Sequence, residues 1–125
     1  MEKKILFVDD YDDIRTAVST MISLRGYQVY EASDGHEAVE STRRHRPDLV
    51  LMDLAMPGFN GIEAAREIRS YPDVAHIPLV AVTAHGQQYR HQALEAGFDE
   101  VVDKGRFIED MFPIIETYLP NEAIH

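Results

Sequence analysis

The stretch Leu49-Val50-Leu51-Met52-Asp53 decides the fold, because four apolar residues in a row end in a carboxylate. Uninterrupted apolar runs of this length are typical of strands that are buried on both faces, as in a parallel sheet. Similar runs lie at residues 5–8, 79–82 and 101–102. The segment 27–32 mixes polar and apolar residues, which is typical of an edge strand. The chain therefore contains five predicted strands.

Helical patterns separate these strands. Apolar residues recur at helical spacing after Asp12, and Gly26 predicts the end of that helix. Strands that alternate with helices through short connections predict a parallel sheet covered on both faces. We therefore expect an α/β fold, the flavodoxin-like (βα)5 three-layer sandwich, with five parallel strands in the order 2-1-3-4-5. The other helices are predicted over about 35–44, from Gly61 to a point before Pro72, and over about 87–96.

The last helix has two possible starting points. Its apolar stripe runs from Phe107 to Leu119, and Pro113 interrupts it. Because proline is tolerated in the first helical turn, we expect Asp110 near the N-cap and a regular helix from there to Leu119. A kinked helix that begins nearer Arg106 is the alternative.

The composition is that of one small, acidic domain. The chain has 125 residues, 12 of them basic and 22 acidic, which gives a net charge of −10. Such a surface repels nucleic acid and anionic membranes, so neither is an expected partner. The chain has no cysteine and no stretch as long as a membrane span, so we expect a cytoplasmic protein. Residues 1–120 are expected to form the domain and residues 121–125 a C-terminal tail.

Polar side chains stand where the predicted strands end. Ligands bind at this edge of open parallel sheets, and strands one and three are neighbours in the expected order. The residues concerned are Asp9 and Asp10 after the first strand, Asp53 after the third, Thr83 after the fourth and Lys104 beyond the fifth. The three aspartates should therefore converge on one crevice.

Three carboxylates in one small site repel each other unless a cation neutralises them. Mg²⁺ suits such a site, since it typically binds one or two carboxylates together with water and phosphate oxygens. Lys104 would add a positive charge, and Thr83 a hydroxyl donor. Together these groups predict a pocket for phosphoryl transfer onto a carboxylate.

In order and spacing, these residues resemble the receiver domains of response regulators over nearly the whole chain. The resemblance implies a two-component phosphorelay in which Asp53 accepts a phosphoryl group from a sensor histidine kinase or a histidine phosphotransfer domain. The similar segments are Asp9-Asp10, residues 53–57 with Gly61, residues 78–84, residues 96–99 and Lys104.

The resemblance also implies a role for each site residue. Lys104 and Thr83 would contact phosphoryl oxygens, and the Thr83 contact would reshape the face formed by the fourth helix, the fifth strand and the fifth helix, where a downstream protein binds. The domain would catalyse only its own phosphorylation and dephosphorylation, and we expect a monomer or weak dimer. The implied ligands of Mg²⁺ are Asp9, Asp10, Asp53 and the backbone carbonyl of Ala55.

Two positions depart from the family pattern. Val101 stands where the family usually has a tyrosine or phenylalanine that couples to the switch threonine, and a valine cannot swing as an aromatic ring does. Gly105 stands where a proline usually follows the lysine, often after a cis bond. Because a cis bond before a non-proline residue costs about 2.5–4 kcal/mol, we predict a trans or strained link there. Ala55 and His85 occupy positions that would modulate phosphoryl lifetime.

Two alternative functions use the same residues. One is a Mg²⁺-dependent phosphatase with Asp53 as nucleophile, but such enzymes typically carry a second aspartate where this chain has Ala55. The other is a phosphorylation-independent pseudo-receiver that acts as a protein-binding module. Val101 and Gly105 leave room for it, whereas the complete acidic set with Thr83 and Lys104 argues against it.

Overall fold

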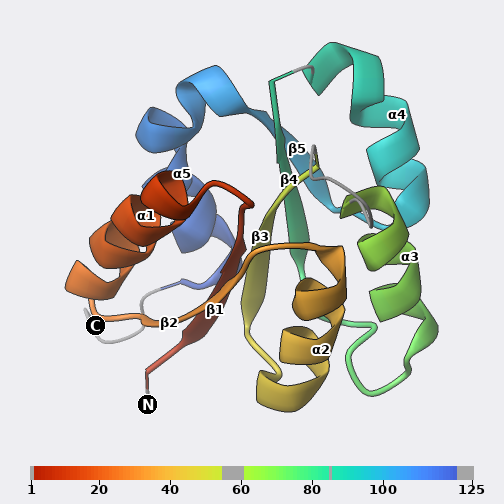
Figure 1. Ribbon diagram of the computed structural model, residues 1–125, viewed down its shortest axis with the longest axis horizontal. Helices are drawn as coiled ribbons and strands as arrows, with labels where there is room; N and C mark the ends of the chain where they lie inside the picture. Colours follow the sequence, from red (N-terminus) through yellow and green to blue (C-terminus); the bar gives the residue numbers. More distant parts are fainter. Residues whose placement is uncertain (1, 55–60, 85, 121–125) are drawn as a thin grey trace.

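The structure is a computed structural model that describes residues 2–54, 61–84 and 86–120. Strands and helices alternate along the chain (Figure 1). The strands are β1 (Lys4–Val8), β2 (Gln28–Ala32), β3 (Leu49–Asp53), β4 (Leu79–Thr83) and β5 (Glu100–Asp103). The helices are α1 (Asp12–Leu24), α2 (Gly35–His45), α3 (Gly61–Ser70), α4 (Gly86–Ala96) and α5 (Phe107–Tyr118), with a 3₁₀ turn at Lys104–Arg106.

The five strands form one parallel sheet in the order β2-β1-β3-β4-β5, which confirms the predicted fold. β1 lies between β2 and β3, so its carboxyl end stands beside the carboxyl end of β3. β4 lies between β3 and β5, with Asp53 in register with Val82 and Thr83 with Asp103. The sheet order therefore brings the ends of β1, β3, β4 and β5 to one edge.

Apolar side chains cover both faces of the sheet. Successive side chains of a strand point to opposite faces, so an uninterrupted apolar run places apolar residues on both. On one face, residues such as Val50 and Met52 pack with α2, α3 and α4. On the other face, residues such as Leu49 and Leu51 pack with α1 and α5. Figure 1 shows these three layers, with α1 and α5 on one side and α2, α3 and α4 on the other.

The ends of α1 and α3 follow the predicted signals. α1 ends at Leu24, just before Gly26, whose φ of 98° lies in the left-handed region that favours glycine. α2 begins after Asp34, whose side chain accepts a hydrogen bond of 2.8 Å from the backbone N–H of Glu37. α3 ends at Ser70, before Pro72 as predicted.

The predicted start of the last helix at Asp110 is wrong. α5 begins at Phe107, directly after the 3₁₀ turn, and Pro113 lies in its interior. Phe107 is buried and stacks on Phe7 with 5.9 Å between the ring centroids. Burying a phenylalanine contributes about 1.5–3 kcal/mol, which offsets much of the cost of an interior proline, about 3 kcal/mol. The alternative start nearer Arg106 is the one that the structure shows.

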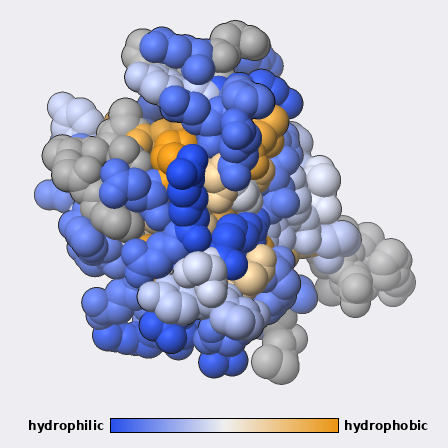
Figure 2. Space-filling view, turned by 90° about the vertical axis from the view of Figure 1, so that its right-hand side faces the viewer, coloured by the Kyte–Doolittle hydropathy of each residue, from blue (hydrophilic) through white to orange (hydrophobic). Residues whose placement is uncertain are grey.

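Figure 2 shows that the side of the molecule carrying α3 and α4 is mostly hydrophilic. None of the helices in the described ranges combines the length and the apolar character that a membrane crossing needs. The tail at residues 121–125 and the positions Ala55 and His85 lie outside the described residues.

Candidate functional site

Three carboxylates converge at the carboxyl edge of the sheet. Asp9 and Asp10 follow β1 and Asp53 ends β3, and one carboxylate oxygen from each lies within 4.8 Å of the others. Asp9 and Asp53 are buried, with 2% and 3% exposure, whereas Asp10 is exposed. The cluster predicted from the sequence therefore forms, and it reaches the surface through Asp10.

Lys104, which directly follows β5, also contacts this cluster. Its Nζ donates a hydrogen bond of 2.8 Å to Asp53 Oδ2 and lies 3.8 Å from Asp9 Oδ2. Burial favours the uncharged amine, but the hydrogen bond to Asp53 and the charges of Asp53 and Asp9 outweigh it and raise the pKa of Lys104. Lys104 is thus held as a cation, which leaves three carboxylates with one ammonium.

The surroundings of Asp9 raise the pKa of its carboxyl group. Burial is the main cause that raises its pKa, and the neighbouring charges of Asp53 and Asp10 act in the same direction. The backbone N–H of Tyr11 donates a 2.9 Å hydrogen bond to Asp9 Oδ1, and this bond and Lys104 oppose the rise. An additional cation would favour the ionised form of Asp9.

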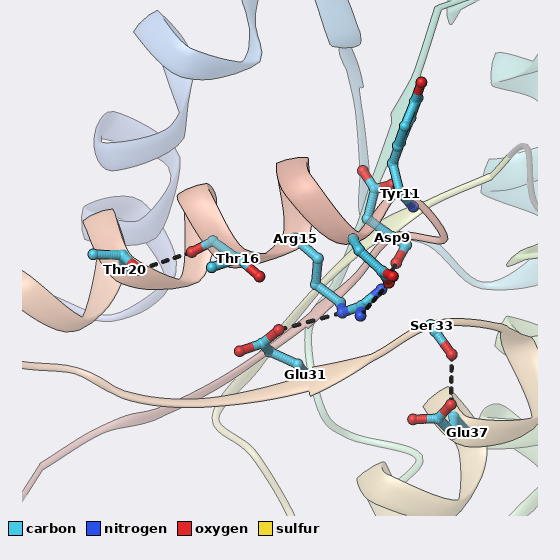
Figure 3. A network of polar contacts seen from close by, with 9 residues as sticks. Asp9, Tyr11, Arg15, Thr16, Thr20, Glu31, Ser33 and Glu37 are labelled. Atoms are coloured by element: carbon cyan, nitrogen blue, oxygen red, sulfur yellow. Dashed lines mark hydrogen bonds and ion pairs between the residues drawn. The ribbon is translucent and has the colours of Figure 1, made fainter.

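Arg15 ties the turn after β1 to its neighbours (Figure 3). Its Nη1 donates to the backbone oxygen of Asp9 at 2.8 Å, its Nε to Glu31 Oε1 at 3.2 Å and its Nη2 to Asp12 Oδ1 at 2.6 Å. One guanidinium therefore links the acidic turn, α1 and β2. Arg15 is not among the residues predicted from the sequence, where its spacing of three residues from Asp12 is the sole signal.

Thr83 lies at the same edge of the sheet. It is the last residue of β4, between β3 and β5, and is 1% exposed. Val82, the residue before it, is in register with Asp53. The structure therefore brings together Asp9, Asp10, Asp53, Thr83 and Lys104, all of which the sequence singled out.

The two departures from the family pattern have clear local structures. Val101 on β5 is half-buried and packs against the core that faces α2, α3 and α4. No cis peptide bond occurs among the described residues, so the link between Lys104 and Gly105 is trans, as predicted. The N–H of Gly105 donates a 2.8 Å hydrogen bond to Asp103 Oδ1, a contact that the sequence analysis did not foresee.

The donor atoms of the cluster fit a hard divalent cation. Three carboxylates offer oxygen ligands, and the described part of the chain adds no sulfur or imidazole to the group. Mg²⁺ prefers oxygen donors and keeps part of its water shell, which the exposed Asp10 side of the cluster permits. The chemistry of the site therefore suits Mg²⁺ and a phosphate-containing ligand.

Sequence comparisons agree with this interpretation of the site. Residues 5–116 match the model of the response regulator receiver domain. The polar-differentiation response regulator DivK of Brucella anthropi is 32% identical over 124 residues, which cover 95% of this chain and 98% of DivK. The response regulator GacA of Pseudomonas syringae is 39% identical over 116 residues, which cover 90% of this chain and 53% of GacA. The chain thus spans about half the length of GacA.

Solved structures show the same fold. The receiver domain of sensor histidine kinase PA1611 from Pseudomonas aeruginosa, which has a magnesium ion in its active site cleft, has a TM-score of 0.87 and 31% identity, covering 97% of this chain and 100% of that one. Response regulator TrrA of Thermotoga maritima, in complex with Mg²⁺-BeF, has a TM-score of 0.82 and 31% identity, covering 94% and 99%. The chain belongs to the response regulator receiver domain family of two-component systems.

Proposed function

We propose that Asp53 is the phosphoacceptor of this receiver domain. The observation that carries the proposal is the group of three carboxylates within 4.8 Å, with Lys104 Nζ 2.8 Å from Asp53 Oδ2. Asp53 is the buried last residue of β3, and its neighbours would pair with the negatively charged oxygens of a phosphoryl group. This arrangement supports Asp53 over Asp9 and Asp10 as the acceptor, because Lys104 donates its hydrogen bond to Asp53.

The proposed reaction transfers the phosphoryl group from an N-phosphohistidine of a donor protein. A carboxylate oxygen of Asp53 attacks phosphorus, and an O–P bond forms while the P–N bond breaks. The electron pair of the P–N bond stays on the imidazole nitrogen, which takes up a proton. Lys104 would pair with one phosphoryl oxygen and the Thr83 hydroxyl would donate to another, so that both neutralise charge developing in the transition state.

Asp9, Asp10 and Asp53 would hold Mg²⁺, with the backbone carbonyl of Ala55 as a further ligand; Ala55 lies outside the described residues. When bound, Mg²⁺ would neutralise the carboxylates and the phosphoryl oxygens, which is the chemistry that the charge balance of the cluster calls for. The donor set of carboxylate oxygens supports this assignment.

The proposed donors are a sensor histidine kinase or a histidine phosphotransfer domain, and the proposed downstream target is a protein that binds the α4–β5–α5 face. The net charge of −10 supports protein partners rather than nucleic acid or membrane. We further propose that residues 1–120 form the domain, that it is a cytoplasmic monomer or weak dimer, and that it catalyses only its own phosphorylation and dephosphorylation.

Mass spectrometry with a small phosphodonor tests the proposal. We expect the chain to gain one phosphoryl group from acetyl phosphate when Mg²⁺ is present and to gain none in EDTA. Asp53→Asn should abolish the gain, whereas Asp13→Asn, which changes an exposed aspartate on α1, should leave it intact. If the parent chain gained no phosphoryl group from acetyl phosphate or from a phosphotransfer protein, the pseudo-receiver function would replace this proposal.

A further inference from the structure

The direction of the Lys104 side chain depends on the turn that follows β5. Lys104 comes directly after the last residue of that strand, and its side chain reaches across the sheet edge to Asp53. A lysine side chain has four rotatable carbon bonds, so fixing its ammonium group costs conformational entropy. A turn that fixes the backbone at Lys104 lowers this cost, because it removes alternative directions before the side chain begins.

One hydrogen bond fixes that turn. Asp103 Oδ1 accepts from the N–H of Gly105 at 2.8 Å, and this bond caps the 3₁₀ turn Lys104–Arg106. The bond joins the two residues that flank Lys104 in the chain, so it constrains the backbone of Lys104. Asp103 is anchored in turn, since it lies in β5 in register with Thr83 of β4. Strand pairing thus fixes Asp103, and Asp103 fixes the turn that carries Lys104.

The turn depends on the backbone N–H of residue 105 and not on the absence of a side chain there. A Cβ at Gly105 would meet Asp103 Oδ1 at 3.4 Å, which is an ordinary van der Waals contact. The φ of Gly105 is not in the left-handed region, so an alanine would fit without strain. A proline at this position would have no N–H to donate. The observed turn therefore requires a residue other than proline at position 105.

We propose that Asp103 is a positioning residue for Lys104: its carboxylate holds the N–H of Gly105 and thereby directs the Lys104 ammonium to Asp53. This inference rests on the proposed function, in which Lys104 pairs with the phosphoryl group on Asp53. Asp103 itself is exposed and acts through the turn, so it is a separate residue from the cluster of carboxylates.

The first test measures how strongly the Lys104 amine is protected from chemical modification, and it needs neither phosphate nor metal. Lysine acetylation by a small reagent, mapped by mass spectrometry, compares Lys104 with the exposed Lys3 of the same molecule. The hydrogen bond to Asp53 protects Lys104 in the parent chain. In Asp103→Ala we expect the ratio of Lys104 to Lys3 acetylation to rise about fivefold, as the loss of one hydrogen bond implies. An unchanged ratio would overturn the inference.

Asp103→Asn separates the hydrogen bond from the charge. The amide oxygen still accepts from Gly105, so we expect the parent ratio in this variant. If Asp103→Asn behaved like Asp103→Ala, the negative charge would be the active feature and the positioning role would be refuted.

A double-mutant cycle tests whether Asp103 acts through Gly105. Asp103→Ala should have no further effect on Lys104 acetylation in a Gly105→Pro background, because the donor is already gone, whatever Gly105→Pro does by itself. In a Gly105→Ala background the donor remains, so the full effect should persist. An equal effect of Asp103→Ala in both backgrounds would contradict the proposed route.

Beryllofluoride binding links the position of Lys104 to its proposed role. Calorimetry with Mg²⁺ and beryllofluoride should show affinity reduced about five- to tenfold in Asp103→Ala and restored in Asp103→Asn. The affinity for Mg²⁺ alone should not fall, whereas general unfolding would weaken both ligands. A parent chain that did not bind beryllofluoride would count against the proposed function, while the acetylation ratios would still decide whether Asp103 positions Lys104.

Discussion

Lys104 Nζ lies 2.8 Å from Asp53 Oδ2, although 51 positions separate the two residues in the sequence. The contact joins the end of β5 to the end of β3 across β4. It places one ammonium among three carboxylates. The site is therefore partly neutralised by the protein's own chain, and a metal ion that bound these carboxylates would compete with Lys104 for them.

Replacing Lys104 should weaken the fold and favour metal binding. In Lys104→Met we expect the free energy of unfolding in EDTA to fall by about 1–3 kcal/mol, because buried carboxylates lose their cation. The affinity for Mg²⁺ should rise several-fold, since the ammonium no longer competes, and saturating Mg²⁺ should recover most of the lost stability. Urea unfolding with and without Mg²⁺ measures both effects. Lys3→Met, at an exposed position, is the control, and equal stability of the two variants in EDTA would contradict the prediction.

Arg69 should be among the most sensitive residues outside the site. Its guanidinium donates to the backbone oxygens of Gly97, Ala75 and Ile77 and to Asp99. It therefore connects α3 to the loop before β4 and to the loop between α4 and β5. Arg69→Ala should lower the free energy of unfolding by about 2–4 kcal/mol, because several carbonyls lose their donors.

Arg69→Lys should recover little of this loss, since a lysine ammonium cannot reproduce the planar set of donors. Arg66→Ala, on the exposed side of the same helix, provides the matched control and should change stability by less than about 0.5 kcal/mol. Thermal unfolding of the three variants distinguishes these cases. A lysine variant as stable as the parent would show that charge alone suffices at position 69.

Replacing the buried Thr42 with valine should stabilise the protein. It is fully buried in α2, and its hydroxyl has no hydrogen-bond partner among the described residues. Thr42→Val keeps the shape of the side chain and removes the unsatisfied hydroxyl, so the free energy of unfolding should rise by about 1 kcal/mol. Thr20→Val on α1 is the control, because Thr20 is exposed. Chemical denaturation measures the change, and a loss of stability in Thr42→Val would mean that its hydroxyl is satisfied in solution.

Tyr118 should make stability depend on alkaline pH. Burial and the hydrogen bond of 3.0 Å from its hydroxyl to Glu100 Oε1 raise the pKa of Tyr118 to about 12, from an ordinary value of 10.0. Between pH 10.0 and about 12, Tyr118 therefore keeps its hydroxyl proton in the folded state and loses it in the unfolded state. The stability contributed by this group is complete below pH 10.0 and declines as the pH rises towards 12.

Tyr118→Phe should remove this part of the pH dependence and cost about 1 kcal/mol at neutral pH through the lost hydrogen bond. Denaturant unfolding at a series of pH values measures the slope for the parent and the variant. Tyrosinate absorbance near pH 12 should also be smaller in Tyr118→Phe than in the parent, by the contribution of one tyrosine. The same slope in both proteins would exclude Tyr118 as its source.

Predictions from the sequence are wrong or incomplete at particular places, each where a distant contact competes with a local signal. The predicted start of the last helix is Asp110, because Pro113 favours a first-turn position. Packing of Phe107 on Phe7, 100 positions earlier in the chain, instead starts the helix at Phe107. Arg15, whose partner Glu31 lies on a different element, is likewise not predicted. Such contacts leave no periodic pattern in the sequence.

The sequence by itself determined the five strands and the residues at their carboxyl ends, because burial on both faces imposes uninterrupted apolar runs on β1, β3 and β4. The order of the strands could be predicted because alternating strands and helices indicate the flavodoxin-like topology. The tertiary structure alone decided which of the three aspartates pairs with Lys104, and it alone revealed the bond between Asp103 and Gly105. The physical reason is one of range. Hydrophobic patterning acts through the average environment of a segment, whereas a hydrogen bond depends on the positions of two atoms to within a few tenths of an ångström.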